Sequence, residues 1–295
     1  MLITKVEKLS PKERFLYWIE ERHNIFLKKE SGKPKPWTDD EVLQNYFFTN
    51  PFRENDKVTR WFAKSFRDRL DEDEMVELIF GTVCFRWFNY IPTGEILIKE
   101  NLLKRWNLGR ALRILKAVRD KGEQVFTGAF MINSRGGVGK LKNICERITN
   151  VWKDREGIAD DISQENTLQA VHKILTRYEG LGGFMAYEVV TDLRHTFVLR
   201  DATDIMTWCN PGPGAIRGIC RIEGIPFAKG NNASSPKKPQ NILDLMNDLR
   251  KYANKNLPSL APFEMRDIEH SLCEYDKYCR ALEGDGRMKR TYQGY

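Results

Sequence analysis

Four ionisable residues lie close together near the middle of the sequence: Glu188, Asp192, Arg194 and His195. The two carboxylates are four residues apart, so a helix would place them on one face. Two interpretations stay open. Either the four side chains form a partly exposed ion-pair cluster, with His195 stabilised at the C-terminus of the helix, or they form a polar site. In such a site a carboxylate would orient an amine or remove its proton.

A glycine-rich turn precedes these residues, in the segment YEGLGGFMAYEVV at 178–190. The segment before it, NTLQAVHKILTRY, predicts a helix, so together they predict a helix–hairpin–helix motif. Gly180 and Gly182 allow turn conformations that other residues rarely adopt. Exposed amides at the N-terminus of the second helix would bind an anion, and we expect a phosphate of the DNA backbone. An ordinary connector between two helices is the alternative.

A second dense group of ionisable side chains lies in PFEMRDIEHSLCEYDKY at 262–278, which predicts a helix. Asp267 and His270 are candidate catalytic residues, and Arg266 is a candidate phosphate ligand. A solvated helix face is the alternative explanation, although solubility alone does not require so many charges.

Two further segments hold candidate ligands for DNA or pyrophosphate. Arg53 and Arg60 would share a helical face and clamp a phosphate if a helix begins before Arg53, and buried Arg–Glu pairing is the alternative. Asn210 and Arg217 belong to TWCNPGPGAIRG, where prolines and glycines fix the backbone before a helix. This rigid turn is either a wall of a binding site or a structural corner.

The segment SRGGVGKLKN at 134–143 invites comparison with a nucleotide-binding P-loop. That motif needs glycine where the chain has Ser134, and serine or threonine where it has Leu141. Both tests fail, so this loop is not expected to bind ATP, and kinase activity is not expected of this chain alone. A glycine-rich turn with Lys140 facing a phosphate stays open.

Helical patterns dominate the chain. Ser10 and Pro11 suit the cap and first turn of a helix, and Pro92 is expected to end another. We predict short strands at 124–132 and 196–200, a mobile insert at 228–241 and a basic tail at 284–295. The fold class is mainly α, as one domain of two packed helical lobes over residues 1–295. The predicted helices cover 10–32, a segment starting at 38 or 39, 57–70, 71–91, 100–107, 109–121, 140–153, 163–178, 184–194, a helix with Arg217, 241–253 and 263–283.

Composition narrows the class of protein. The chain has 295 residues, of which 41% are hydrophobic and 30% charged, which is typical of a soluble globular protein. We find no apolar run long enough to cross a membrane and no secretory signal, so we expect a cytoplasmic protein. The net charge of +7 permits a polyanionic partner. The six cysteines form no CxxC pair, so no metal site and no cofactor are predicted.

Five blocks in order resemble one known family: PWTDDEVLQNYFFTNPFRENDKVTRWF, VFTGAFMI, GGFMAYEVVTDLRHT, NPGPGAIRG and EMRDIEHSLCEYDKY. This is the alpha-glutamyl/putrescinyl-thymine pyrophosphorylase family, also described as amino acid:DNA transferases and as the helical domain associated with 5-hydroxymethyluracil DNA kinases. The resemblance implies an all-α fold similar to helix–hairpin–helix DNA glycosylases. It also implies thymine hypermodification in bacteriophage DNA, where an amine of an amino acid or polyamine displaces pyrophosphate from activated 5-hydroxymethyluracil.

The resemblance implies partners and roles as well. The partners are double-stranded DNA with a flipped base, an amino acid or polyamine, and a DNA kinase, in the host cytoplasm if the chain is encoded by a phage. The leaving pyrophosphate would be stabilised by arginines, and the amine deprotonated by a carboxylate or histidine. Divalent metal assistance stays open. The arginine candidates are Arg53, Arg60, Arg194, Arg217 and Arg266, and the base candidates are Glu188, Asp192, His195 and His270.

Two alternative functions stay open. A DNA glycosylase or lyase would need a catalytic aspartate beyond the hairpin, where the sequence offers Asp204 or Asn210. A DNA-binding module without catalytic activity would instead position a partner kinase.

Overall fold

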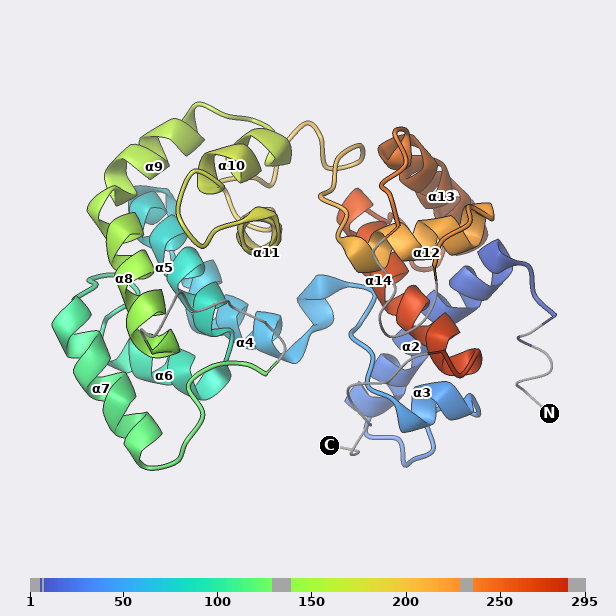
Figure 1. Ribbon diagram of the computed structural model, residues 1–295, viewed down its shortest axis with the longest axis horizontal. Coiled ribbons are helices and arrows are strands. Elements are labelled where there is room, and N and C mark those ends of the chain that lie inside the picture. Colours follow the sequence, from blue (N-terminus) through green and yellow to red (C-terminus); the bar gives the residue numbers. More distant parts are fainter. Residues whose placement is uncertain (1–5, 7, 129–138, 229–235, 286–295) are drawn as a thin grey trace. The chain divides into compact units, whose positions relative to one another are not determined.

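The computed structural model describes residue 6 and residues 8–128, 139–228 and 236–285. The chain divides into two compact units, which we describe separately. Unit 1 consists of residues 1–56 and 205–295, and unit 2 of residues 57–204. Both units are helical, and the described residues contain no β-strand (Figure 1). The predicted mainly α class is therefore confirmed.

Unit 2 is built around one buried helix, α5 (Met75–Phe88), which contacts α6, α8, α9 and α11 (Figure 1). Every residue of α5 from Leu78 to Phe88 is buried. A helix that is apolar on all sides belongs in the interior of a protein, as here. The remaining helices of the unit are α4 (Lys57–Ser65), α6 (Ile91–Lys99), α7 (Leu108–Asp120), α8 (Lys140–Lys153), α9 (Arg155–Ser163), α10 (Leu168–Leu175) and α11 (Gly183–Leu193), with short 3-10 helices at Arg67–Arg69 and Glu72–Glu74.

One charged residue interrupts the buried stretch of α5 from Leu78 to Phe88. Arg86 and Asp192 of α11 are both completely buried and form a two-bonded ion pair. The Arg86 Nη2 atom donates to Asp192 Oδ1 at 2.5 Å and to Thr59 Oγ1 at 3.1 Å, and Nη1 donates to Asn89 Oδ1 at 2.7 Å. The pair therefore joins α5 to α11 and is linked to α4 through Thr59.

Unit 1 contains the two ends of the chain. Its helices are α2 (Pro11–Glu30), α3 (Glu41–Asn45), α12 (Pro213–Glu223), α13 (Ile242–Asn256) and α14 (Met265–Leu282), with a 3-10 helix at Arg53–Asn55. Ser10 caps α2 through the amide of Glu13, and Pro11 occupies the first turn, as predicted.

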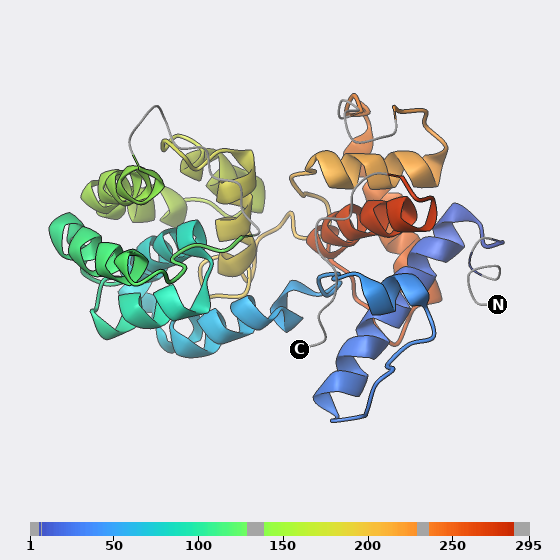
Figure 2. The same ribbon diagram turned by 60° about the horizontal axis from the view of Figure 1, so that its bottom comes forward.

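Close contact between α12 and α14 organises unit 1, and both views show the two helices side by side (Figures 1 and 2). Two glycines of α12 make this contact possible. A Cβ atom on Gly218 would lie 2.3 Å from the carbonyl oxygen of Leu272, and one on Gly214 would lie 2.4 Å from Cys273 Sγ. Asp276 of α14 is fully buried and accepts from Arg217 Nε at 2.8 Å and Arg221 Nε at 2.9 Å. Backbone contact and ion pairing therefore act together.

Several predicted elements are wrong in detail. Residues 196–200 form turns instead of a strand, and the described part of 124–132 is not a strand. Residues 100–107 are turns and loop, and the helix of this region, α6, lies earlier at Ile91–Lys99 with Pro92 in its first turn. Pro92 does not itself end α5, which stops at Phe88. The predicted helix at 163–178 is shorter (α10), and α9 before it was not foreseen. The tip of the predicted insert (229–235) and most of the tail (286–295) lie outside the described residues.

Within the described part of the chain, no helix is both long and apolar enough to span a membrane. The organisation as one two-lobed domain stays a prediction.

The close contact between α12 and α14 predicts that one methyl group added to α12 lowers the stability of the protein considerably. Gly218→Ala should lower the free energy of unfolding by at least about 2 kcal/mol, because the backbone of Leu272 leaves no space for Cβ. Gly212→Ala is the matched control, since its Cβ would meet nothing nearer than 3.9 Å, and a change within about 1 kcal/mol is expected. Urea unfolding followed by circular dichroism measures both. Equal stability of the two variants would contradict the packing argument.

The buried ion pair predicts a second stability difference. Asp192→Asn should lower the free energy of unfolding by about 3–5 kcal/mol, because it leaves the buried charge of Arg86 uncompensated. Asp161→Asn removes a carboxylate from an exposed pair with Arg177 and should change stability by less than about 1 kcal/mol. The same unfolding experiment compares them, and a change below about 1 kcal/mol for Asp192→Asn would argue against the pair as an anchor of α11.

Candidate functional site

The predicted hairpin is the turn between α10 and α11. Gly180 has φ +88°, a left-handed conformation that favours glycine, whereas Gly182 has φ −64° and ψ 175°, which any residue can adopt. The prediction that both glycines need special conformations is therefore correct for Gly180 and wrong for Gly182. Leu181 is fully buried, and its amide donates to the carbonyl of Tyr178 at 3.0 Å, which closes the turn.

The N-terminus of α11 is the predicted anion-binding end of the hairpin, a role that stays a prediction. Its cap residue is Gly182, which has no side chain to accept a bond from the first amides. Those amides have no partner within the helix and carry the positive end of its dipole. His172 of α10 donates through Nε2 to the carbonyl of Gly183 at 2.9 Å, so the two helices are fastened together beside the turn. Burial lowers the pKa of His172.

The ionisable cluster on α11 is more buried than expected. Asp192 belongs to the ion pair with Arg86, so its expected place on an exposed polar face is wrong. Glu188 is 8% exposed, one turn earlier on the same helix. Arg194 and His195 follow the helix and are half-buried, and Arg194 Nη1 donates to the carbonyl of Arg200 at 3.1 Å. The catalytic roles of Glu188, Asp192 and His195 stay predictions.

Asp204 has a clear local role. Its carboxylate accepts from the amides of Leu168 at 2.7 Å and Gln169 at 3.0 Å, beside the N-cap Thr167. Asp204 therefore caps α10 from outside the helix, and it fastens the segment after α11 to the start of the hairpin. No local pattern indicates this contact, because capping residues are normally recognised by their position just before the helix.

The N-terminal half of α14 gathers polar groups in unit 1. Asp267 Oδ2 accepts from the amide of Glu264 at 2.9 Å, as part of a capping box. His270 Nε2 lies 2.8 Å from Thr49 Oγ1, and Glu274 Oε2 accepts from the amide of Thr49 at 3.0 Å. The segment around Thr49 is therefore attached to the same side of α14 as His270. Arg266, on the same helix, is buried.

Glu269 connects this half of α14 to the Pro- and Gly-rich turn. Its Oε1 accepts from the amide of Gly212 at 3.2 Å, so a carboxylate occupies the N-terminus of α12. Asn210 lies half-buried two residues earlier. Arg217 points instead to Asp276, so this predicted phosphate ligand takes part in a structural ion pair. Sequence reasoning did not identify Glu269.

The other predicted basic ligands belong to different helices. Arg53 belongs to a 3-10 helix of unit 1 and Arg60 to α4 of unit 2, which begins only at Lys57, so the expected common helical face is wrong. Lys140 is the first residue of α8, and its Nζ lies 4.6 Å from the ring centroid of Phe126. Burial lowers the pKa of Lys140. Residues 134–138 of the glycine-rich loop lie outside the described residues.

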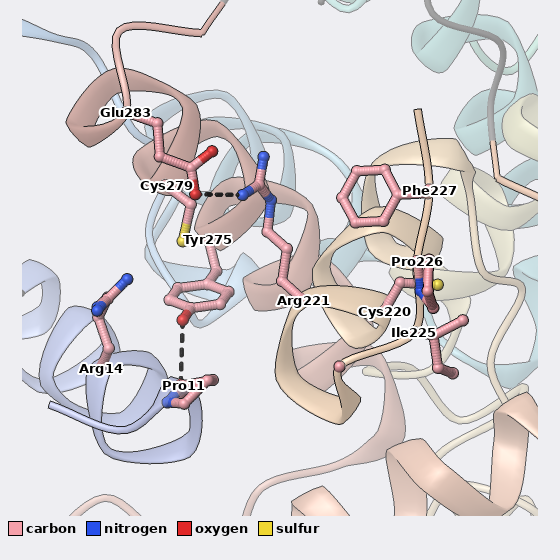
Figure 3. A pocket seen from close by; sticks show the side chains of 11 residues that line it. Pro11, Arg14, Cys220, Arg221, Ile225, Pro226, Phe227, Tyr275, Cys279 and Glu283 are labelled. Atoms are coloured by element: carbon pink, nitrogen blue, oxygen red, sulfur yellow. Dashed lines mark hydrogen bonds and ion pairs between the residues drawn. The ribbon is translucent and has the colours of Figure 1, made fainter. Parts of the chain in front are cut away.

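A pocket of about 390 Å³ lies in unit 1, between the start of α2 and the ends of α12 and α14 (Figure 3). Figure 3 shows the guanidinium of Arg221 between the ring of Phe227 and the carboxylate of Glu283. Arg221 donates to Asp276 and, at 2.7 Å, to Glu283. None of the predicted site residues lines this pocket. Within the described residues, no group of three or more His, Cys, Asp or Glu side chains is arranged to hold a metal ion.

Comparison with known proteins identifies the family. The family described as "5-hmdU DNA kinase, helical domain" matches residues 11–287, so the chain belongs to it. The 5-hmdU DNA kinase of Bacillus phage SP10 is 29% identical to this chain over 228 residues, which cover 69% of this chain and 35% of that kinase. The chain thus spans about a third of the length of this relative. No solved structure matches the chain.

Proposed function

We propose that this member of the 5-hmdU DNA kinase helical-domain family acts in the hypermodification of thymine in phage DNA, as a transferase. Its substrate would be 5-hydroxymethyluracil in DNA that carries a pyrophosphate on the exocyclic oxygen, and its second substrate an amino acid or polyamine. The observation that carries this proposal is the family match over residues 11–287, which covers nearly the whole chain. The glycine-capped hairpin and the positive net charge support a role on DNA.

The proposed reaction is a substitution at the exocyclic carbon of the base. The amine nitrogen forms a bond to the methylene carbon while the carbon–oxygen bond to pyrophosphate breaks, and pyrophosphate leaves with the bonding electrons. The amine must lose one proton to a general base. Glu188 of unit 2 and His270 of unit 1 are our candidates for that base. Because the target base is stacked inside a duplex, it must be flipped out before it reacts.

The second candidate function is that of a helical DNA-binding module that positions DNA for a kinase. The family description and the name of the phage SP10 relative both refer to a kinase, and the chain matches only 35% of that relative. The missing P-loop residues at Ser134 and Leu141 argue that phosphoryl transfer would need a separate catalytic part. In this case the chain would bind 5-hydroxymethyluracil DNA without changing it.

One incubation separates these functions. Duplex DNA with pyrophosphorylated 5-hydroxymethyluracil is incubated with the protein and a panel of amino acids and polyamines, and its nucleosides are then analysed by mass spectrometry. The transferase proposal expects a nucleoside with the mass of an amine adduct and an equal amount of released pyrophosphate. Free base and strand scission after alkali would indicate a glycosylase or lyase instead. Unchanged DNA would indicate the DNA-binding module, if the protein also makes an added 5-hydroxymethyluracil DNA kinase phosphorylate the DNA faster than the kinase does alone.

The hairpin predicts a DNA-binding effect that does not depend on the chemistry. Gly182→Ala should weaken DNA binding about tenfold, because its Cβ would project into open space at the helix end where a phosphate would approach. Nothing in the described chain lies within 4 Å of this Cβ, so folding should be unchanged.

Gly139→Ala is the matched control, since Gly139 caps α8 and a Cβ added to it would also have nothing within 4 Å. Fluorescence anisotropy with a labelled duplex measures both variants. If Gly139→Ala weakens binding and Gly182→Ala does not, the phosphate site lies at the start of α8 beside Lys140, and the hairpin is an ordinary connector.

A further inference from the structure

An arginine from another helix, whose side chain is 10% exposed, lies against the hairpin. Arg147 of α8 packs on the Cα atom of Gly180, because a Cβ added there would lie 2.7 Å from Arg147 Cδ, 3.1 Å from Nη1 and 3.2 Å from Nε. Gly180 is therefore required for two independent reasons, its positive φ and the approach of this side chain. Sequence reasoning did not identify Arg147, which precedes the hairpin by more than thirty residues.

The guanidinium of Arg147 is incompletely satisfied. Its side chain is only 10% exposed, and its Nε atom is buried with no hydrogen-bond partner in the described part of the chain. Its ion pair joins Nη2 to Glu179 Oε1 at 3.5 Å, the long limit of a hydrogen bond, and the Glu179 side chain is half exposed. A buried cation normally has a closer carboxylate or several hydrogen bonds, as Arg86 has.

A second positive group follows closely in sequence on the residue that Arg147 contacts. The N-terminus of α11 begins two residues after Gly180, at the cap Gly182, which has no side chain to accept from the first amides. The helix end carries a partial positive charge. An oxyanion between the two would be attracted to both. Arginine also suits phosphate geometrically, because its planar donors match two phosphate oxygens.

We propose that Arg147 is a phosphate-binding residue and that, with the amides at the start of α11, it holds one phosphate of the DNA backbone. This inference rests on the proposed function in that the ligand is taken to be DNA. On binding, the phosphate replaces Glu179 as the partner of Arg147, and the Glu179 carboxylate turns into solvent. Because Gly180 has no side chain, Arg147 can approach the turn that leads into these amides.

The test compares two charge-removing substitutions on the same helix. Arg147→Gln should weaken duplex binding about tenfold and reduce the slope of log affinity against log salt by about one phosphate contact. Lys142→Gln removes one positive charge from an exposed residue of α8 that pairs with Glu146, and it should change affinity less than about twofold with no change in slope. Equal effects of the two substitutions, or an unchanged slope for Arg147→Gln, would overturn the proposal.

For a third substitution we expect tighter DNA binding, a result that loss of folding could not produce. Glu179→Gln removes the carboxylate that competes with the phosphate for Arg147, so it should tighten duplex binding about threefold or more. Unchanged or weaker binding by this variant would count against the proposal, even if Arg147→Gln were too unstable to measure.

Inorganic phosphate tests whether the site binds free phosphate or a phosphate of DNA. If millimolar phosphate protects the wild-type protein from heat and Arg147→Gln abolishes that protection without altering duplex binding, the site binds free phosphate and the assignment to DNA is wrong. Wild-type protein that binds no duplex at all would contradict the proposed function itself, whereas normal wild-type binding with no effect of Arg147→Gln contradicts only the role of Arg147.

Discussion

The buried charge of Arg86 is the constraint on which unit 2 depends. Its guanidinium lies in the central helix, near the rings of Phe62 and Phe85, where a cation is tolerated only with a counter-charge and hydrogen bonds. Asp192 supplies the counter-charge from α11. The same pair that neutralises the core thus fixes the helix whose first residues form the hairpin, so the direction of its amides is determined by an interaction at its opposite end.

This role limits what Asp192 can do in catalysis. If its carboxylate took up a proton from an amine, the guanidinium of Arg86 would remain in the core without a counter-charge, at a cost of several kcal/mol. Glu188, one turn earlier, stands outside the pair between Arg86 and Asp192 and retains some exposure. Of the two carboxylates that share a face in the sequence pattern, Asp192 supports the fold, and Glu188 stays our proposed candidate for chemistry.

Local signals predicted most of the helices and the turn between α10 and α11, since caps and glycine turns depend on residues close in sequence. Ser10 with Glu13, and Gly180 before an apolar helix, are examples. Contacts between distant residues could not be predicted this way. Asp192 and Arg86 are 106 residues apart, and Asp204 accepts from the amide of Leu168, which lies 36 residues before it. For this reason the sequence pattern revealed the clusters of ionisable residues. It did not show which of their charges pair within the fold and which are left for a functional site.

In unit 1, residues of the Pro- and Gly-rich turn are likewise used by the fold, but here close helix contact contributes as well as ion pairing. Its glycines at 214 and 218 serve contact between two helix backbones, and Arg217 neutralises the buried Asp276. A structural corner and a wall of a binding site are nevertheless compatible. Close packing on α12 fixes α14, and α14 carries Asp267 and His270 near its start. Unit 2 thus positions its polar residues by charge pairing, whereas unit 1 combines ion pairs to Asp276 with close helix contact at two glycines. Added volume at these glycines should therefore displace α14, and loss of the charge of Asp192 should displace α11.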